Sequence, residues 1–169
     1  LRADGSLGGF IVSQGDIFVN GGALNASAQQ LLELVMRSVK LEANVNAPEI
    51  AITTGTNQWD YGTRAITGSV GATGSAPVYA IDSSALGGMY ANRIQLTSTE
   101  AGVGVRMLGE AAASAEDFTL TAAGRVELRN RISAQRDVLV ASSSKEAAAI
   151  ALVDASLTAA RDARIGASQ

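Results

Sequence analysis

The side chains of this chain that could do chemistry are few, because its 169 residues include neither histidine nor cysteine. Their absence removes the usual triad bases, thiol nucleophiles, disulfides and common zinc ligands. Two carboxylates, Asp82 and Glu100, stand in otherwise apolar sequence and could act as the acid and base of a glycosidase. We expect instead that each accepts hydrogen bonds from backbone N–H groups at a corner of the chain. The sequence therefore predicts no catalytic residue and no enzyme.

The cluster Trp59-Asp60-Tyr61 is the best candidate for a binding site. An aromatic platform beside a carboxylate suits contact with a sugar or a protein partner, provided that it lies on an exposed loop. The alternative is that Trp59 packs back over the rest of the fold. We keep Trp59, Asp60 and Tyr61 as the candidate binding residues.

Four aspartates each open a short alternating segment: Asp16, Asp117, Asp137 and Asp162. Stacked along one corner, they could suggest a calcium site, but the dense Gly-Asp repeat of calcium-binding nonapeptides is missing. They fit residues that start turns equally well. No glycine spacing matches a nucleotide-binding loop. The sequence therefore predicts neither a metal nor a cofactor.

The composition is that of a folded chain with a core of small side chains. Hydrophobic residues make up 47% of the sequence, aromatic residues only 4%, and there are 18 glycines. Small and β-branched aliphatic residues suit strands stacked in layers. The formal net charge is −3, and the basic residues form no stripe, which argues against nucleic acid. No apolar stretch approaches the roughly 20 residues of a membrane helix, so no membrane insertion by this segment is expected.

A repeat runs along the chain. The segments opened by Asp117, Asp137 and Asp162 start 20 and 25 residues apart, which is typical of solenoids. Between the aspartate segments lie further stretches with a period of two: 39–41, 50–52, 94–96, 103–105, 126–128 and 132–134. Short strands separated by Gly, Asn or Ser turns favour an all-β fold, a parallel β-helix (solenoid) of about seven rungs.

Three regions are less regular. Residues 27–37 and 145–164 contain good helix formers, and Ser27 with Gln30 could form a capping box. Local propensity leaves helix and strand about equal there, and the repeat favours strands. Residues 53–77 are polar and rich in glycine, which indicates a loop or small excursion from the rod. We expect one β-helix segment over residues 1–169, with this excursion at 53–77.

One stretch carries a family resemblance. Residues 85–106 read Ala-Leu-Gly-Gly-Met-Tyr-Ala-Asn-Arg-Ile-Gln-Leu-Thr-Ser-Thr-Glu-Ala-Gly-Val-Gly-Val-Arg. This stretch of sequence resembles a signature near the end of the haemagglutination-activity domain of filamentous haemagglutinin-like two-partner-secretion exoproteins. The segments 7–10, 22–26 and 54–61 agree with the family in the same order. The resemblance thus covers the C-terminal part of that domain and the rungs that follow.

The resemblance implies a right-handed parallel β-helix in a large exported protein of a Gram-negative cell. Such proteins pass an outer-membrane partner transporter and act as adhesins, haemolysins or contact-dependent growth-inhibition effectors, some of which contact receptors or glycans on host or neighbouring cells. Recognition by the transporter uses Asn-Pro motifs nearer the N-terminus of the family. Pro48 and Pro77 are the only prolines here and neither follows Asn, so this segment should not be secretion-competent alone.

These observations predict a structural and interaction segment of a secreted or surface-displayed exoprotein. Two alternatives stay open: a carbohydrate-active β-helix enzyme, a lyase or hydrolase, and a direct glycan- or receptor-binding module. The signature residues have a structural interpretation in either case. We expect Gly87 and Gly88 to permit a tight corner, and Gly102 and Gly104 to let the backbone crowd a rung without Cβ clashes, with Glu100 beside them.

Overall fold

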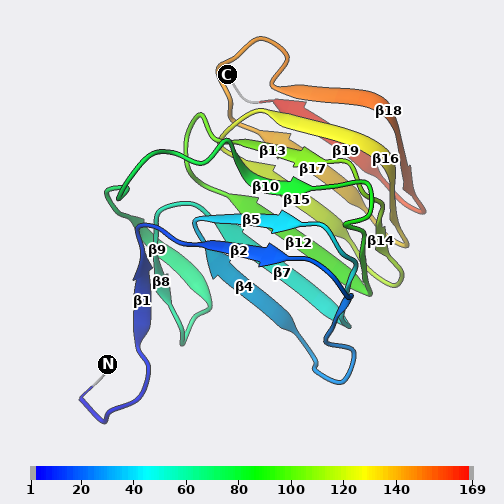
Figure 1. Cartoon of the computed structure of the whole chain (residues 1–169). Helices are drawn as coiled ribbons and strands as arrows, with labels where there is room; N and C mark the ends of the chain where they lie inside the picture. The colour runs from blue at the N-terminus through cyan, green and yellow to red at the C-terminus, as the bar shows by residue number, and fades with distance from the viewer. Residues whose placement is uncertain (1–2, 168–169) are drawn as a thin grey trace.

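The computed structural model describes residues 3–167 and folds them into a parallel β-helix (Figure 1). Strands are the regular structure of this part of the chain, and among its residues no helix is long and apolar enough to cross a membrane. The prediction of an all-β solenoid is confirmed. Residues 27–37 and 145–164 contribute strands and not helices, because their apolar residues extend the repeat of their neighbours.

The rod has three faces, each built from one strand or half-strand per turn. The first face contains β2 (Asp16–Val19), β5 (Ser38–Leu41), β10 (Tyr79–Ser83), β13 (Gly104–Met107) and the first halves of β16 (Val126–Ala134) and β18 (Ile150–Ala159). The second face contains β3 (Leu24–Asn25), β6 (Val45–Asn46), β11 (Met89–Ala91), β14 (Ala111–Ala113) and the second halves of β16 and β18. The third face contains β4 (Leu32–Met36), β7 (Glu49–Thr54), β12 (Arg93–Ser98), β15 (Phe118–Ala122), β17 (Val138–Ser142) and β19 (Ala163–Ala167).

These faces make six turns, one fewer than the sequence suggested. Each strand pairs in parallel with the strand of the next turn, and like residues stack along the axis. On the third face the column runs through Ile50, Ile94, Phe118 and Val138, all fully buried. The period of two places these side chains inside and their neighbours outside.

The interior explains the unusual composition. Apart from Phe118, the rod core consists of aliphatic residues, methionine and alanine, and the second face contributes Ala91, Ala111 and Ala113. A triangular cross-section only one side chain deep on each face leaves little room for larger rings. The sparsity of aromatic residues is therefore a consequence of the rod geometry.

The excursion from the rod is a small antiparallel sheet. Its strands β1 (Gly9–Val12), β8 (Asn57–Asp60) and β9 (Ala65–Ser69) lie in the order β1-β8-β9 beside the N-terminal turns (Figure 1). Thr53 and Thr54, which were expected in the excursion, belong to β7 and are buried in the rod. The chain thus leaves the rod at Gly55 as a hairpin, and β1 completes the sheet.

One detail of the predicted repeat is wrong. Asp16 opens a strand of the first face, whereas Asp117, Asp137 and Asp162 each directly precede a strand of the third face. Short alternating strands look alike on every face, so the sequence could not tell which corner an aspartate occupies. The aspartate ladder therefore has three members and excludes Asp16.

Candidate functional site

The candidate binding residues lie on β8, in the middle of the antiparallel sheet. Trp59 pairs with Phe10 of β1 and Ile66 of β9, and only 5% of its surface is exposed. Its indole Nε1 has no hydrogen-bond partner among the described residues. The expected exposed platform is therefore not present at Trp59, because its ring is buried on the side of the sheet that shares a pocket with Ala51 and Thr53 of β7.

The other two members of the cluster differ from Trp59. The Asp60 carboxylate accepts hydrogen bonds from the Thr63 backbone N–H (2.7 Å) and hydroxyl (2.9 Å), which closes the turn of the hairpin. Tyr61 is 55% exposed. A contact with a partner at this hairpin would therefore rest on Tyr61, while Trp59 and Asp60 hold the strand and turn that present it.

A buried ion pair fastens the hairpin to the rod. The Arg37 guanidinium donates to both carboxylate oxygens of Glu100, at 3.0 and 2.8 Å, and to the Thr73 carbonyl oxygen at 2.9 Å. Arg37 is only 4% exposed, and its bond to Glu100 raises the pKa of the guanidinium. Because Thr73 lies on the segment that returns from the hairpin, this contact joins the corner after β4, the hairpin and the turn after β12.

This pairing corrects the expectation for Glu100. The sequence suggested backbone N–H partners for Glu100, whereas its partner Arg37 lies 63 residues away along the chain. The available signal was an arginine within the apolar alternation of residues 32–41, where an unpaired charge would be costly. Its partner could not be identified without knowing which corners adjoin.

Uncharged polar groups beside the Arg37–Glu100 pair also hold the hairpin to the rod. The Asn57 side chain is fully buried; its amide donates to the Thr54 carbonyl (3.2 Å), and its oxygen accepts from the Thr99 hydroxyl at 2.7 Å. Gly55 has φ of +114°, and a Cβ there would overlap the Thr99 side chain. On the outer side, Arg64 donates to Glu33 of β4 at 2.9 Å. The hairpin is thus held to the rod by contacts on two sides.

The signature glycines serve different purposes. A Cβ on Gly87 would overlap the Leu41 carbonyl of the preceding turn, and one on Gly88 would come within 2.8 Å of the Tyr90 ring. Gly104 lies in a crowded rung, as expected, because the Arg125 carbonyl oxygen is 3.1 Å from the position of a Cβ at residue 104. Gly102 does not: no atom lies within 4 Å of the position of its Cβ, and it is the φ of +78° that favours glycine there.

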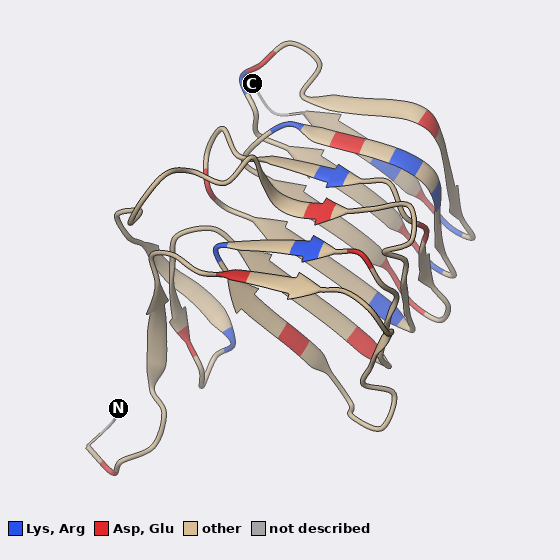
Figure 2. Cartoon of the chain, in the orientation of Figure 1, with Lys and Arg blue, Asp and Glu red and all other residues tan. Residues whose placement is uncertain are grey.

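Asp82 belongs to a row of alternating charge on the first face. Lys40, Asp82, Arg106 and Glu127 follow one another across β5, β10, β13 and β16 (Figure 2). Arg106 donates to both Asp82 oxygens, at 2.8 and 3.0 Å, and stacks 4.4 Å from the centre of the Tyr79 ring. Both of the carboxylates that the sequence singled out therefore have bidentate arginine partners, and within residues 3–167 neither accepts the expected hydrogen bonds from backbone N–H groups.

The carboxylates of Asp117 and Asp137 in the aspartate ladder accept hydrogen bonds from other groups of the protein. Asp117 accepts the backbone N–H of Asp137 at 3.0 Å, and Asp137 accepts that of Asp162 at 3.2 Å. Arg161 adds bonds of 3.1 and 2.7 Å to Asp137. Within residues 3–167 no group of acidic side chains could hold a metal ion. These contacts assign the ladder a part in turning the corner.

Comparisons with known proteins agree with one another. Residues 1–128 match the family described as the TPS secretion domain. Over 131 residues, 78% of this chain, the sequence is 46% identical to a protein named "tRNA nuclease CdiA-2" from Burkholderia pseudomallei (strain 1026b). It is 40% identical over 137 residues, 81% of this chain, to "Toxin CdiA" of Yersinia pestis. The aligned part is only 4% of the length of each of these relatives.

A solved structure extends the match to three dimensions. The fold superposes on the filamentous hemagglutinin secretion domain with a TM-score of 0.80 and 28% sequence identity, over 94% of this chain and 54% of the other. The family match ends at Leu128, within β16. Strands β17 to β19 therefore add turns beyond the matched region.

Proposed function

Because this chain belongs to the family of TPS secretion domains, we propose that it forms a structural segment of a two-partner-secretion exoprotein, exported through a dedicated outer-membrane transporter. The observation that carries the proposal is the match of residues 1–128, a span that includes the hairpin and the first turns of the rod. In this proposal the exported rod reaches the medium or the surface of a Gram-negative cell and displays whatever the parent protein carries beyond it.

The geometry suits export as an unfolded chain. Most rod contacts join one turn to the next, so each turn can fold on the one before it once outside the cell. The rod itself then serves as the template, and no cofactor is required for this role. The Arg37–Glu100 pair is the main exception, since it joins the start of the second turn to the end of the third.

A chimera tests the export proposal. Residues 1–128 would replace the segment of the toxin CdiA of Yersinia pestis that aligns with them, and the rest of that protein stays unchanged. We expect the chimera to reach the surface of cells that make that protein's transporter, and not of cells that lack it. Residues 1–169 behind a periplasmic signal alone should stay in the periplasm, because no Asn-Pro motif is present. A chimera that folds yet stays in the periplasm would contradict the proposal.

For the parent protein we favour toxin delivery over adhesion. The relatives at 46% and 40% identity bear the names of a tRNA nuclease and a toxin, whereas the identity to filamentous hemagglutinin is 28%. Cells that produce the parent should inhibit the growth of neighbours in co-culture. Attachment to host cells without growth inhibition would favour the second candidate, an adhesin.

We further propose that the segment has no catalytic role of its own. Its two singled-out carboxylates are held by Arg37 and Arg106, which supports a structural part for each. Turnover on a panel of neutral and acidic glycans, abolished by Glu100→Gln or Asp82→Asn, would establish the rival carbohydrate-active enzyme instead.

Receptor contact at the hairpin stays a proposal, and Tyr61 is the residue that the geometry favours for it. Binding of the purified segment to target cells that falls with Tyr61→Ala, and not with Tyr79→Ala, would support it. Equal binding by both variants would rule out this hairpin as the contact.

A further inference from the structure

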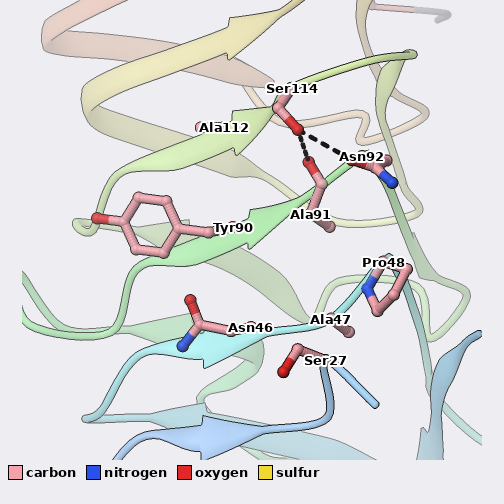
Figure 3. A pocket seen from close by; sticks show the side chains of 9 residues that line it. All are labelled: Ser27, Asn46, Ala47, Pro48, Tyr90, Ala91, Asn92, Ala112 and Ser114. Carbon is pink, nitrogen blue, oxygen red and sulfur yellow. Dashed lines mark hydrogen bonds between the residues drawn. The ribbon is translucent and has the colours of Figure 1, made fainter. Parts of the chain in front are cut away.

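A shallow groove runs along the edge of the second face, away from the hairpin and the ion pairs. Its volume is about 370 Å³. The lining residues come from the first four turns of the rod, with Asn46, Tyr90 and Ala112 side by side on neighbouring strands (Figure 3). Three steps of about 4.8 Å between strands give the groove a length of about 14 Å.

The Tyr90 ring is fixed against the rod in this groove. Gly88 lies beneath it, and even a Cβ there would come within 2.8 Å of the ring. The hydroxyl donates to Glu110 at 3.4 Å, and burial together with that carboxylate raises the pKa of Tyr90. On the next strand only the Ala112 methyl group stands beside the ring, so one aromatic face stays open to the groove.

Uncharged polar groups surround this ring. Among the described residues, the Asn46 side-chain amide has no hydrogen-bond partner. At the other end, the Ser114 hydroxyl lies 3.1 Å from the Asn92 side-chain oxygen and 3.2 Å from the Ala91 carbonyl oxygen. No charged side chain of this part of the chain lines the groove. The surface therefore offers amides and hydroxyls around an aromatic face.

We propose that this groove binds a neutral oligosaccharide. The apolar face of a sugar ring can stack on Tyr90, as apolar surfaces stack on aromatic rings in general. Sugar hydroxyls can exchange hydrogen bonds with Asn46, Asn92 and Ser114. An elongated groove along the rod axis suits a linear chain of sugars, and its uncharged lining disfavours an acidic one.

A peptide fits this surface less well. An extended peptide usually binds by adding a strand to a free sheet edge. The strands that form this groove, β6, β11 and β14, are each paired on both sides. The groove is also too shallow to hold an anchoring side chain, because its floor is closed by buried Ala47 and Ala91. These features favour stacking over strand addition.

The test uses the purified 169-residue chain and two sets of probes: neutral gluco-, manno- and galacto-oligosaccharides, from disaccharide to hexasaccharide, and neutral peptides of similar length. Saturation-transfer NMR detects binding, and calorimetric titration measures its strength. We expect binding that strengthens with sugar length up to the span of the groove. Tyr90→Ala should weaken it roughly tenfold or more, and Tyr90→Phe, which keeps the platform, should retain most of it.

Two further variants distinguish this groove from other exposed aromatic rings as the place where the sugar binds. Ala112→Leu fills the hollow beside the ring without removing a contact of the core, and should also weaken binding. Phe18→Ala, which removes an exposed ring on the first face, should leave binding unchanged. Absence of sugar binding by the wild-type chain, binding of neutral peptides alone, or loss of sugar binding with Phe18→Ala but not with Ala112→Leu would overturn the proposal. This result does not depend on the export experiment.

Discussion

At the scale of single residues, the backbones of successive turns approach so closely at some corners that only glycine fits there. Gly87 lies against the Leu41 carbonyl, so Gly87→Ala should lower the free energy of unfolding by about 1–3 kcal/mol, the usual cost of overpacking. Gly71→Ala is the matched control, because nothing lies within 4 Å of its Cβ position, and it should cost less than about 0.5 kcal/mol. Urea denaturation of both variants measures the difference, and equal stabilities would contradict the close approach.

Trp59 offers a second prediction at this scale. Its ring is buried, so Trp59→Ala should lower the free energy of unfolding by about 3–5 kcal/mol. Trp59→Phe should cost clearly less, because Nε1 has no partner among the described residues and no hydrogen bond is lost. If thermal melts show that Phe and Ala are equally destabilising, then the indole nitrogen has a role that packing does not explain.

At the scale of elements, the hairpin depends on one buried ion pair. Glu100→Gln should loosen the segment that returns from the hairpin, because Arg37 loses its charged partner while it holds Thr73. Hydrogen exchange over residues 55–78 should quicken while exchange in β12 and β15 stays slow.

The control for this change is Glu127→Gln, which removes the partner of the exposed Arg129 on the first face. Exposed pairs contribute little, so its exchange pattern should match the wild type. Uniformly faster exchange across the rod in Glu100→Gln would mean that the pair stabilises the whole solenoid and not the hairpin.

The aspartate corner gives a pH dependence. Burial raises the pKa of Asp137, but the bonds from Arg161 and from the Asp162 N–H outweigh it, so the net pKa lies below the ordinary 3.8. A carboxyl with a lowered folded pKa contributes stability above its unfolded pKa and loses it as the pH falls through the folded value. The stability gap between wild type and Asp137→Asn should therefore be present at pH 7 and shrink below about pH 4. A gap of constant size in urea titrations at both pH values would contradict this assignment.

The elements differ in how far the sequence could predict them. Alternating segments such as 94–96 and 126–128 carry their own signal, and they lie in β12 and β16 as expected. The antiparallel sheet could not be foreseen, because Phe10 pairs with Trp59 nearly fifty residues away. Nothing in the intervening sequence indicates that these two strands are neighbours. For the same reason the burial of Trp59 and the partner of Glu100 required the structure.

At the scale of the whole molecule, stacking makes the rod nearly one-dimensional. Val39 and Ile81 are register neighbours on successive turns, whereas Val138 lies three turns beyond Val39. The losses in the free energy of unfolding caused by Val39→Ala and Val138→Ala should add to within about 0.5 kcal/mol in the double variant. For Val39→Ala and Ile81→Ala the double variant should deviate from the sum of the two losses by more than that. Double-mutant cycles in urea measure both sums. Strong coupling between the distant pair would show that the turns do not act independently.

The hairpin also shows how the rod accommodates foreign sequence. The chain leaves β7 after Thr54 and resumes at Tyr79, yet β5 and β10 still pair in register as if the intervening residues were absent. The corner between the third and first faces is thus a natural grafting site, where a guest segment can be inserted without altering the host. A vaccine epitope or a reporter peptide placed at the equivalent corner after β15 or β17, away from the Arg37–Glu100 pair, would be displayed at a fixed height along the rod, and two guests could be spaced by a whole turn.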